Sequence, residues 1–237
     1  MDVRQMTMQI YWVLGVLGFL VCLAYCYWRY VWFFRNPPRN PPVGESILSP
    51  ADGTVVYVQI VPPNEPVISI KQGLQASVND IVREHLAAPK ILIGVFMSPF
   101  NVHYNRAPLS GQVQYVRHHP PAWQNRHMGM MHLRTVLKQP PYYRNSMHIV
   151  ENERAVTRIA GRHKGRDLAC YVIQIGARTV HGIDSFVQVG EHISRGSVFG
   201  MIRIGSQVDL VVPWVEGMAT RVKPGQRVRA GETILIE

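Results

Sequence analysis

The sequence predicts a mainly β (α+β) domain with a sandwich or barrel-like sheet, preceded by one transmembrane helix. Runs rich in β-branched and aromatic residues, bounded by Gly and Pro, read as strands. They lie at residues 54–61, 91–96, 111–116, 169–175 and 208–212. An uncharged apolar run occupies residues 8–28, and residues 189–202 align with residues 224–237 as an internal repeat.

The N-terminal run is long enough to cross a bilayer. At about 1.5 Å per residue it matches a hydrocarbon core of about 30 Å. A cleaved signal peptide would be shorter and end in small residues, whereas this run passes into aromatic residues. Arg29, Arg35 and Arg39 follow the run and only Arg4 precedes it, so the positive-inside rule places the remaining chain in the cytoplasm. We expect residues 1–34 to anchor the protein in the inner membrane.

The prolines of residues 35–42 (RNPPRNPP) exclude a helix and predict an extended linker. Residues 43–237 are long enough for one domain with its own core. Only residues 75–86 read as a helix. Residues 118–143 show no clean period, and we expect a long loop there, over the surface or the membrane.

The internal repeat predicts two similar strand–turn–strand units. Gly190 matches Gly225, and Gly196 matches Gly231. Two such units can pair as a small sandwich of the lipoyl or biotinyl hammerhead type. The repeat fixes no function, because carriers, adaptors and enzymes all use such half-units.

The charge balance favours anionic partners. Lys and Arg number 25 against 15 Asp and Glu, a formal net charge of +10. Most are arginines, which pair bidentately with phosphate. Helix-turn-helix, zinc-finger and RNP patterns are missing from the sequence, so we expect an anionic membrane surface and no nucleic acid. Cys22, Cys26 and Cys170 form no disulfide framework, which fits a reducing compartment.

One Gly-Ser pair, Gly205-Ser206, stands between two strand-like runs. Glycine has no Cβ, so the serine hydroxyl can reach the preceding carbonyl. Its attack would turn the amide into an ester. Elimination and hydrolysis would then leave a chain that begins with a ketone, a pyruvoyl group, which is an electron sink. The pair alone also fits an ordinary turn.

Two further segments supply acid–base groups. Ser49-Pro-Ala-Asp52-Gly precedes a strand and by itself also fits a turn. His103 follows a buried strand, flanked by amides and an arginine. A carboxylate, an imidazole and a hydroxyl on separate strand ends are what base-assisted attack requires, whatever their chain order. The candidate catalytic residues are therefore Asp52, His103 and Ser206.

With these motifs in order, the chain resembles the short, membrane-tethered prokaryotic phosphatidylserine decarboxylases over nearly its whole length. The motifs are FFRNPPR at 33–39, SPADG at 49–53, NVHYNRAPLSG at 101–111, ENER at 151–154 and RGSVFGMIRIGSQVD at 195–209. The resemblance implies self-cleavage into a β chain of residues 1–205 and an α chain of residues 206–237, which stay associated.

The resemblance also implies a mechanism. Asp52 would orient and charge His103, which would take the proton of Ser206, and Gly205 would be cut. The pyruvoyl group made from Ser206 would be the covalent cofactor, without any metal, and phosphatidylserine would lose its carboxylate to give phosphatidylethanolamine. The sequence leaves open the exact serine phospholipid, any homo-oligomer and whether His103 serves both steps.

Two alternatives stay open at this point. His181 and Asp184 suggest a lysostaphin-like zinc peptidase, but zinc needs about three protein ligands, and the usual His-x-His pair is missing. Histidines 118, 119, 127 and 132 more simply suit a surface loop. A membrane-anchored hammerhead adaptor without enzymatic activity would explain the anchor and the repeat. It would leave the Asp52, His103 and Ser206 motifs without a role.

Overall fold

The computed structural model describes residues 2–63, 65–71, 74–83, 87–178, 182–203 and 206–237. The chain divides into two compact units, Met1–Pro37 and Pro38–Glu237. Part of the predicted linker, from Pro38 on, therefore belongs to the second unit.

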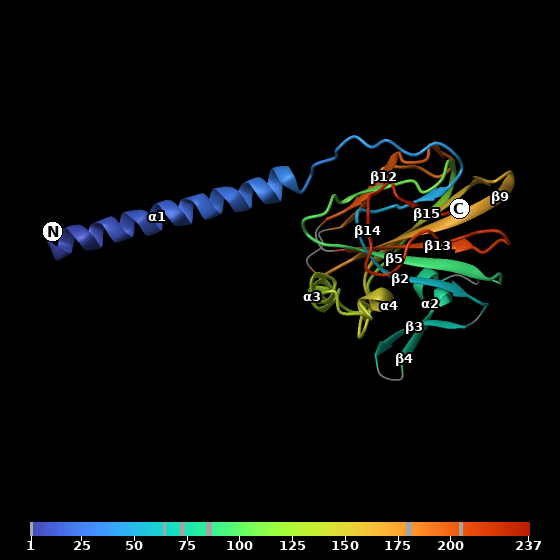
Figure 1. The fold of residues 1–237 in the computed structure, drawn as a ribbon, viewed down its shortest axis with the longest axis horizontal. Helices are drawn as coiled ribbons and strands as arrows, with labels where there is room; N and C mark the ends of the chain where they lie inside the picture. The colour runs from blue at the N-terminus through green and yellow to red at the C-terminus, as the bar shows by residue number, and fades with distance from the viewer. Residues whose placement is uncertain (1, 64, 72–73, 84–86, 179–181, 204–205) are drawn as a thin grey trace. The chain divides into compact units, whose positions relative to one another are not determined.

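The first unit is a single long helix. It comprises α1 (Val3–Tyr27), continued by a π-helical turn, Trp28–Trp32 (Figure 1). Asp2 caps it by accepting a hydrogen bond from the backbone N–H of Arg4 at 3.4 Å. The helix is long and apolar enough to cross a membrane, and none of its apolar window is buried within the protein. The predicted span at 8–28 lies inside this helix. A helix that is apolar on every side is stable in an apolar environment such as a bilayer.

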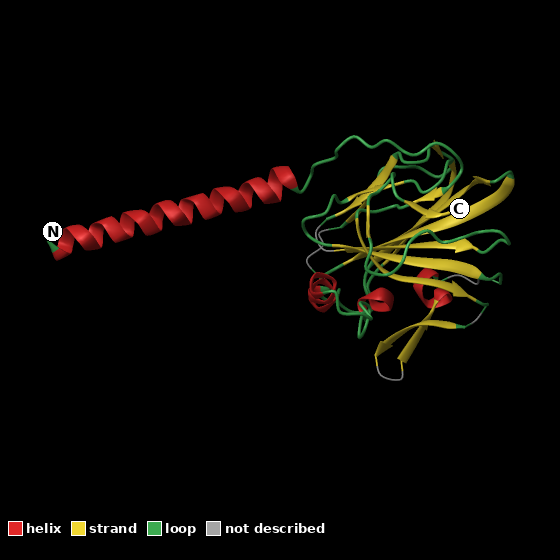
Figure 2. Ribbon diagram, in the orientation of Figure 1, coloured by secondary structure: helices red, strands yellow, loops and turns green. Residues whose placement is uncertain are grey.

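The second unit is built on one curved antiparallel sheet of eight strands, in the order β11-β7-β8-β9-β13-β5-β2-β14 (Figure 2). The strands are β2 (Gly53–Val61), β5 (Lys90–Met97), β7 (Gly111–His119), β8 (Arg154–His163), β9 (Arg166–Gly176), β11 (His192–Ile193), β13 (Ser206–Pro213) and β14 (Arg227–Val228). All five predicted strands lie in this sheet, so the mainly β prediction is confirmed.

Each face of the sheet covers its own apolar core. One core is closed by a small sheet of β6 (Tyr104–Arg106), β10 (Ile183–Ser185) and β12 (Val198–Ile202), and by the pair β1 (Ile47–Leu48) and β15 (Ile234–Ile236). The other lies under α2 (Val78–Val82), α3 (Gly129–Leu137), α4 (His148–Glu151) and the hairpin of β3 (Pro66–Lys71) and β4 (Leu74–Ser77). The helices gather on that one side in Figure 2.

Strand β13 is fully enclosed, which explains its apolar sequence. It pairs with β5 on one side and β9 on the other. Val208, Leu210 and Val212 enter the first core and Val211 the second, as alternation along a strand requires.

The internal repeat is visible in the backbone. Gly190 donates its N–H to Val113 on β7 at 2.8 Å, and Gly225 donates to Val55 on β2 at 2.7 Å. The four repeat glycines all have positive φ: 91° at Gly190 and at its match Gly225, 81° at Gly196 and 73° at its match Gly231. Glycine adopts this region without a steric cost, so both units use glycine for the same turns.

Two sequence predictions need correction. The predicted helix over residues 75–86 begins later than expected, because β4 continues through Ser77 and α2 covers Val78–Val82, while residues 84–86 lie outside the described residues. The predicted loop over residues 118–143 contains α3. That helix begins after Met128 without a side-chain cap, so the sequence carried no start signal, and buried Met131 holds it to the sheet.

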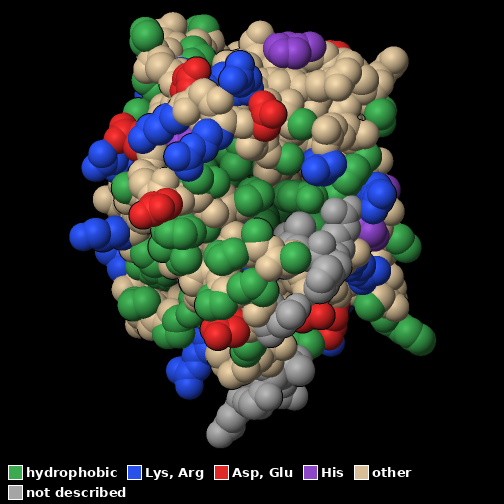
Figure 3. Space-filling view, turned by 90° about the vertical axis from the view of Figure 1, so that its right-hand side faces the viewer, with side chains coloured by type: hydrophobic (Ala, Val, Ile, Leu, Met, Phe, Trp, Pro, Cys, Tyr) green, Lys and Arg blue, Asp and Glu red, His purple; other side chains and the backbone are tan. Residues whose placement is uncertain are grey.

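The basic side chains do not form one stripe on the face drawn in Figure 3. Lys and Arg lie around a central area of hydrophobic side chains on that face.

Candidate active site

Ser206 is the first residue of β13. It is fully buried, and its register partners are Met97 at the end of β5 and Gly176 at the end of β9. Its Oγ lies 3.5 Å from Sδ of Met97. Gly205 lies outside the described residues. The hydroxyl thus sits at the end of a central strand, with a neighbouring strand on each side.

His103 is fully buried just before β6, and its tautomer follows from its neighbour. Its Nδ1 lies 2.9 Å from the backbone carbonyl oxygen of Asn101. A carbonyl only accepts, so Nδ1 carries the proton and Nε2 carries the lone pair. The Asn101 side chain fixes this turn by accepting from the N–H and Oγ of Ser98 at 2.9 and 2.7 Å. His103 is therefore held in a form that takes a proton on Nε2.

A chain of contacts links the His103 segment with Ser206. Strand β6 pairs with β12, and Ile202 donates its N–H to the carbonyl of His103 at 3.3 Å. Asn105, two residues after His103, is the middle residue of β6. Its Nδ2 lies 3.8 Å from Sδ of Met97, the sulfur that also contacts Ser206. Met97 therefore joins the segment carrying the imidazole to the hydroxyl.

Asn105 is a site residue that sequence analysis missed, although it lies within the NVHYNR motif. Its Oδ1 accepts a hydrogen bond from Nε2 of Gln174 on β9 at 2.8 Å, and its Nδ2 donates to the carbonyl of Pro50 at 3.4 Å. Both side chains are buried. Asn105 thereby ties β6 to β9 and to the Ser49–Gly53 turn.

Asp52 makes its hydrogen bonds away from His103. Its two carboxylate oxygens accept from Nη2 of Arg39 at 3.0 and 2.8 Å, and Oδ1 accepts the N–H of Ala230 at 2.7 Å. Glu232 holds the other end of the Arg39 guanidinium at 3.3 Å. The expected direct contact with His103 is not among the hydrogen bonds of Asp52 in the described residues.

The repeat explains this placement. In the other unit, the Oγ of Ser110 accepts the N–H of Arg195 at 2.9 Å, as Asp52 does from Ala230. Asp52 therefore closes a turn. The turn reaches the His103 segment through the Pro50 carbonyl, which accepts the N–H of Arg106 at 2.9 Å.

A buried polar network lies behind Ser206, on the other face of β13. Gln207 donates through Nε2 to Tyr57 Oη at 2.6 Å and to Asp209 Oδ1 at 2.7 Å. Its Oε1 lies 3.1 Å from Nε2 of His148, which donates to it. Burial raises the pKa of Asp209 to about 6 and lowers the pKa of His148 to about 4. His148 is thus neutral near pH 7.

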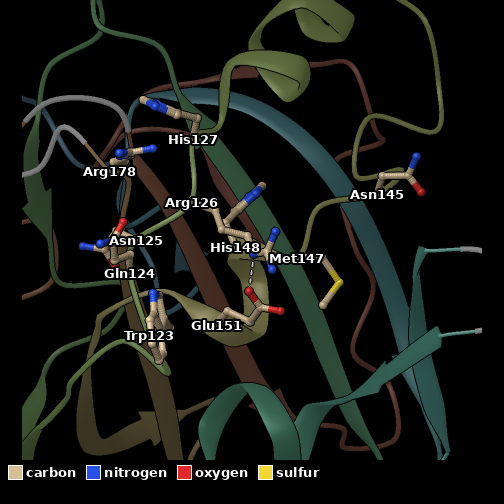
Figure 4. A pocket seen from close by; sticks show the side chains of 10 residues that line it. All are labelled: Trp123, Gln124, Asn125, Arg126, His127, Asn145, Met147, His148, Glu151 and Arg178. Atoms are coloured by element: carbon tan, nitrogen blue, oxygen red, sulfur yellow. Dashed lines mark hydrogen bonds and ion pairs between the residues drawn. The ribbon is translucent and has the colours of Figure 1, made fainter.

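A pocket of about 520 Å³ opens beside this network, with His148 in its wall (Figure 4). It is lined by Trp123, Gln124, Asn125, Arg126, His127, Asn145, Met147, His148, Glu151 and Arg178. Sequence analysis placed four histidines of residues 118–132 on the surface and did not predict a pocket here.

The His181 and Asp184 pair weighed for a zinc peptidase is described only in part. His181 lies outside the described residues, and Asp184 accepts a hydrogen bond from Nε of Arg203 at 2.9 Å. No group of three or more His, Cys, Asp or Glu side chains that would suit a metal ion occurs among the described residues.

Comparison with known proteins identifies close relatives. The family model described as "Phosphatidylserine decarboxylase" matches residues 27–236. A phosphatidylserine decarboxylase proenzyme of Trichlorobacter lovleyi is 35% identical over 207 residues, covering 86% of this chain and 74% of that protein. One of Nitrosomonas eutropha is 34% identical over 206 residues, covering 86% and 76%. A protein of Methanopyrus kandleri, provisionally named archaetidylserine decarboxylase proenzyme, is 35% identical over 209 residues, covering 86% and 79%.

Proposed function

This chain belongs to the phosphatidylserine decarboxylase family, a family of carboxy-lyases, and on that basis we propose that it makes its catalytic group by cutting its own backbone between Gly205 and Ser206. Its reaction is the conversion of phosphatidylserine to phosphatidylethanolamine. The observation that carries the proposal is the buried Ser206 hydroxyl at the start of the central strand β13. Met97 links it to the segment that carries His103.

The proposed cut begins with proton transfer from Ser206 Oγ to Nε2 of His103. The oxygen then attacks the Gly205 carbonyl carbon to form the ester C–O bond. The C–N bond breaks as His103 returns the proton to the leaving nitrogen, which becomes the free amine of residue 206. Loss of the α-proton of residue 206 breaks its Cβ–O bond, which leaves Gly205 with a carboxylate. Hydrolysis of the dehydroalanine releases ammonia and leaves the ketone. These steps need a His103 that accepts a proton on Nε2, and the Asn101 carbonyl sets that tautomer.

The residues around Ser206 fit such a group. When formed, the pyruvoyl ketone supplies the electron sink for decarboxylation. Residue 206 is buried between Met97 and Gly176, which excludes water from it. His103 would hold the proton that the product needs at carbon. Asp52 would act as a positioning residue, through the turn whose Pro50 carbonyl holds the next segment.

The sheet explains how the two chains would remain together. Strand β13 of the 206–237 chain pairs with β5 and β9 of the 1–205 chain, and β14 and β15 pair with β2 and β1. These ladders begin at Ser206 and run away from the cut. The repeat units that contribute β11, β12, β14 and β15 would then be hammerhead-type halves, one in each chain.

The apolar helix α1 would anchor the enzyme in the inner membrane with the catalytic unit on the cytoplasmic side. Its length and composition suit a bilayer, and the arginines that follow it fit the positive-inside rule. The substrate is a membrane lipid, so an anchor keeps the enzyme at its substrate.

The test compares two Gly-Ser pairs of this chain. Wild type should give two chains by intact mass, one ending at Gly205 and one starting at residue 206 without a free amine. Ser206→Ala should stay in one piece and be inactive, because it has no hydroxyl. Ser197→Ala, at the Gly196-Ser197 turn where Oγ donates to the Ser194 carbonyl, should still be cut. Active wild type in one piece, or a cut Ser206→Ala chain, would reject the proposal.

A further inference from the structure

We propose that the pocket in Figure 4 binds the headgroup of the lipid substrate, with Arg178 as the cation that holds its phosphodiester. This inference rests on the proposed function. It also gives a role to the ENER motif at residues 151–154, to which sequence analysis assigned none.

Asn152 holds the backbone of the Arg126 segment, which lines the pocket. It is fully buried, and its Oδ1 accepts the N–H of Arg126 at 2.7 Å. Its Nδ2 donates to the carbonyls of Arg126 at 3.0 Å and Gly176 at 2.7 Å. The N–H of Arg178 adds a bond to the Arg126 carbonyl at 3.2 Å. The two arginines are thereby set on backbone that is fixed before a ligand arrives.

Glu153 fixes the same loop at a second point. Its N–H donates to Oδ1 of Asn125 at 2.7 Å, and its carboxylate accepts from Nδ2 of Asn125 at 3.4 Å. His118 contacts the other carboxylate oxygen of Glu153 at 2.8 Å. Both acidic residues of the motif are therefore engaged, since Glu151 pairs with Arg126.

The charge of the pocket suits a phosphodiester. Arg126 is neutralised by Glu151, while the Arg178 side chain makes no ion pair or hydrogen bond within the described part of the chain. Neutral His148 adds no charge. One surplus positive charge matches the single negative charge of a phosphodiester, since the amine and carboxylate of serine cancel. A guanidinium binds phosphate oxygens through two N–H groups.

The pocket lies near the reacting residue. Arg178 comes two residues after Gly176, the register partner of Ser206 on β9. On the other face, His148 in the pocket wall bonds to Gln207, the neighbour of Ser206. The pocket lining is thus connected to Ser206 in two ways, through the end of β9 beside Gly176 and through Gln207 next to it in the chain.

The size and mouth of the pocket suit a headgroup with its acyl chains outside. Its volume of about 520 Å³ is in the range of small-molecule sites. Trp123 lines it and is 89% exposed. Tryptophan favours the boundary between water and lipid. Such a pocket would bind the serine phosphodiester and leave the acyl chains outside.

The experiment uses the full chain in detergent micelles with phosphatidylserine, and compares Arg178→Gln with Arg166→Gln at the opposite end of β9, where the side chain is exposed. Arg178→Gln should cut itself as fully as wild type but raise KM roughly 10- to 100-fold with little change in kcat, as expected for loss of a charge-assisted contact. Arg178→Lys should recover part of the KM, and Arg166→Gln should match wild type.

Competition identifies the ligand. Glycerophosphoserine should inhibit wild type competitively and inhibit Arg178→Gln at least tenfold less well, and inorganic phosphate should inhibit neither. An unchanged KM in a fully cut Arg178→Gln enzyme would overturn the headgroup site, as would equal inhibition by inorganic phosphate. Failure of the proposed function looks different, because wild type itself would then remain uncut.

Discussion

The amide of Gln207 contacts two buried titratable groups whose pKa values move in opposite directions. Burial raises the pKa of Asp209 from 3.8 to about 6 and lowers that of His148 from 6.5 to about 4. Each change multiplied by about 1.4 kcal/mol per pH unit corresponds to about 3 kcal/mol. The two groups therefore contribute to pH-dependent stability with similar size.

The signs differ. Between pH 4 and 6, folded Asp209 keeps a proton that the unfolded chain has released, so the free energy of unfolding falls as pH rises. Between pH 4 and 6.5, the unfolded chain holds a proton that folded His148 excludes, so the same free energy rises with pH. In the parent chain the two contributions nearly cancel.

Single substitutions should expose each contribution. In Asp209→Asn only His148 remains, and the free energy of unfolding should fall by about 3 kcal/mol from pH 7 to pH 4 relative to the parent. In His148→Gln only Asp209 remains, and it should rise by about 3 kcal/mol over the same range. The amide replacements keep a donor and an acceptor toward Gln207.

The assay is urea unfolding of the full chain in non-ionic detergent at pH 4, 5, 6 and 7. All variants carry Ser206→Ala, so that one uncut chain unfolds. Differences from the parent cancel the titration of other groups. If Asp209→Asn and His148→Gln follow the same pH slope, the opposed burial of the two groups is refuted.

Further substitutions test single contacts. Asn152→Ala removes the three hydrogen bonds of a buried side chain and should lower the free energy of unfolding by about 3 kcal/mol; an unchanged melting temperature would contradict this. Gly94→Ala would place a Cβ 2.3 Å from the Tyr57 ring and should cost about 1–3 kcal/mol in urea unfolding, so wild-type stability would show that the ring moves freely. On denaturing gels His103→Ala should remain uncut, whereas Asp52→Asn should be cut slowly; the reverse order would make the carboxylate the base.

The strands were predictable because the apolar residues of each strand lie together in one short stretch of the sequence. Strand β13 reads as Val208–Val212 with both faces buried, and β5 likewise. Strand β8 was missed because Arg154 and Thr157, although buried, interrupt its apolar pattern. Arg154 is buried with its guanidinium bonded to backbone carbonyls such as that of Ile81 at 2.9 Å, a partner that sequence does not reveal.

The candidate site was predictable only in part. Ser206 and His103 stand in short motifs, and both are buried, Ser206 as the first residue of β13 and His103 just before β6. The partners of Asp52 come from Arg39, 13 residues earlier, and Ala230, 178 residues later. A turn motif shows that Asp52 has a local role, but only the fold shows which distant groups meet it.

The proposed self-cleavage would also change how this enzyme loses its activity on unfolding. The described ladder of β13, from Ser206 onward, lies on one side of the proposed cut, and the cut turns one folding chain into two. The apolar helix that would anchor the enzyme lies in residues 1–205, and residues 206–237 contain no such helix. Once the sheet opens, the short chain can diffuse away. Inactivation of the mature enzyme would then be irreversible and governed by the rate of opening rather than by equilibrium stability.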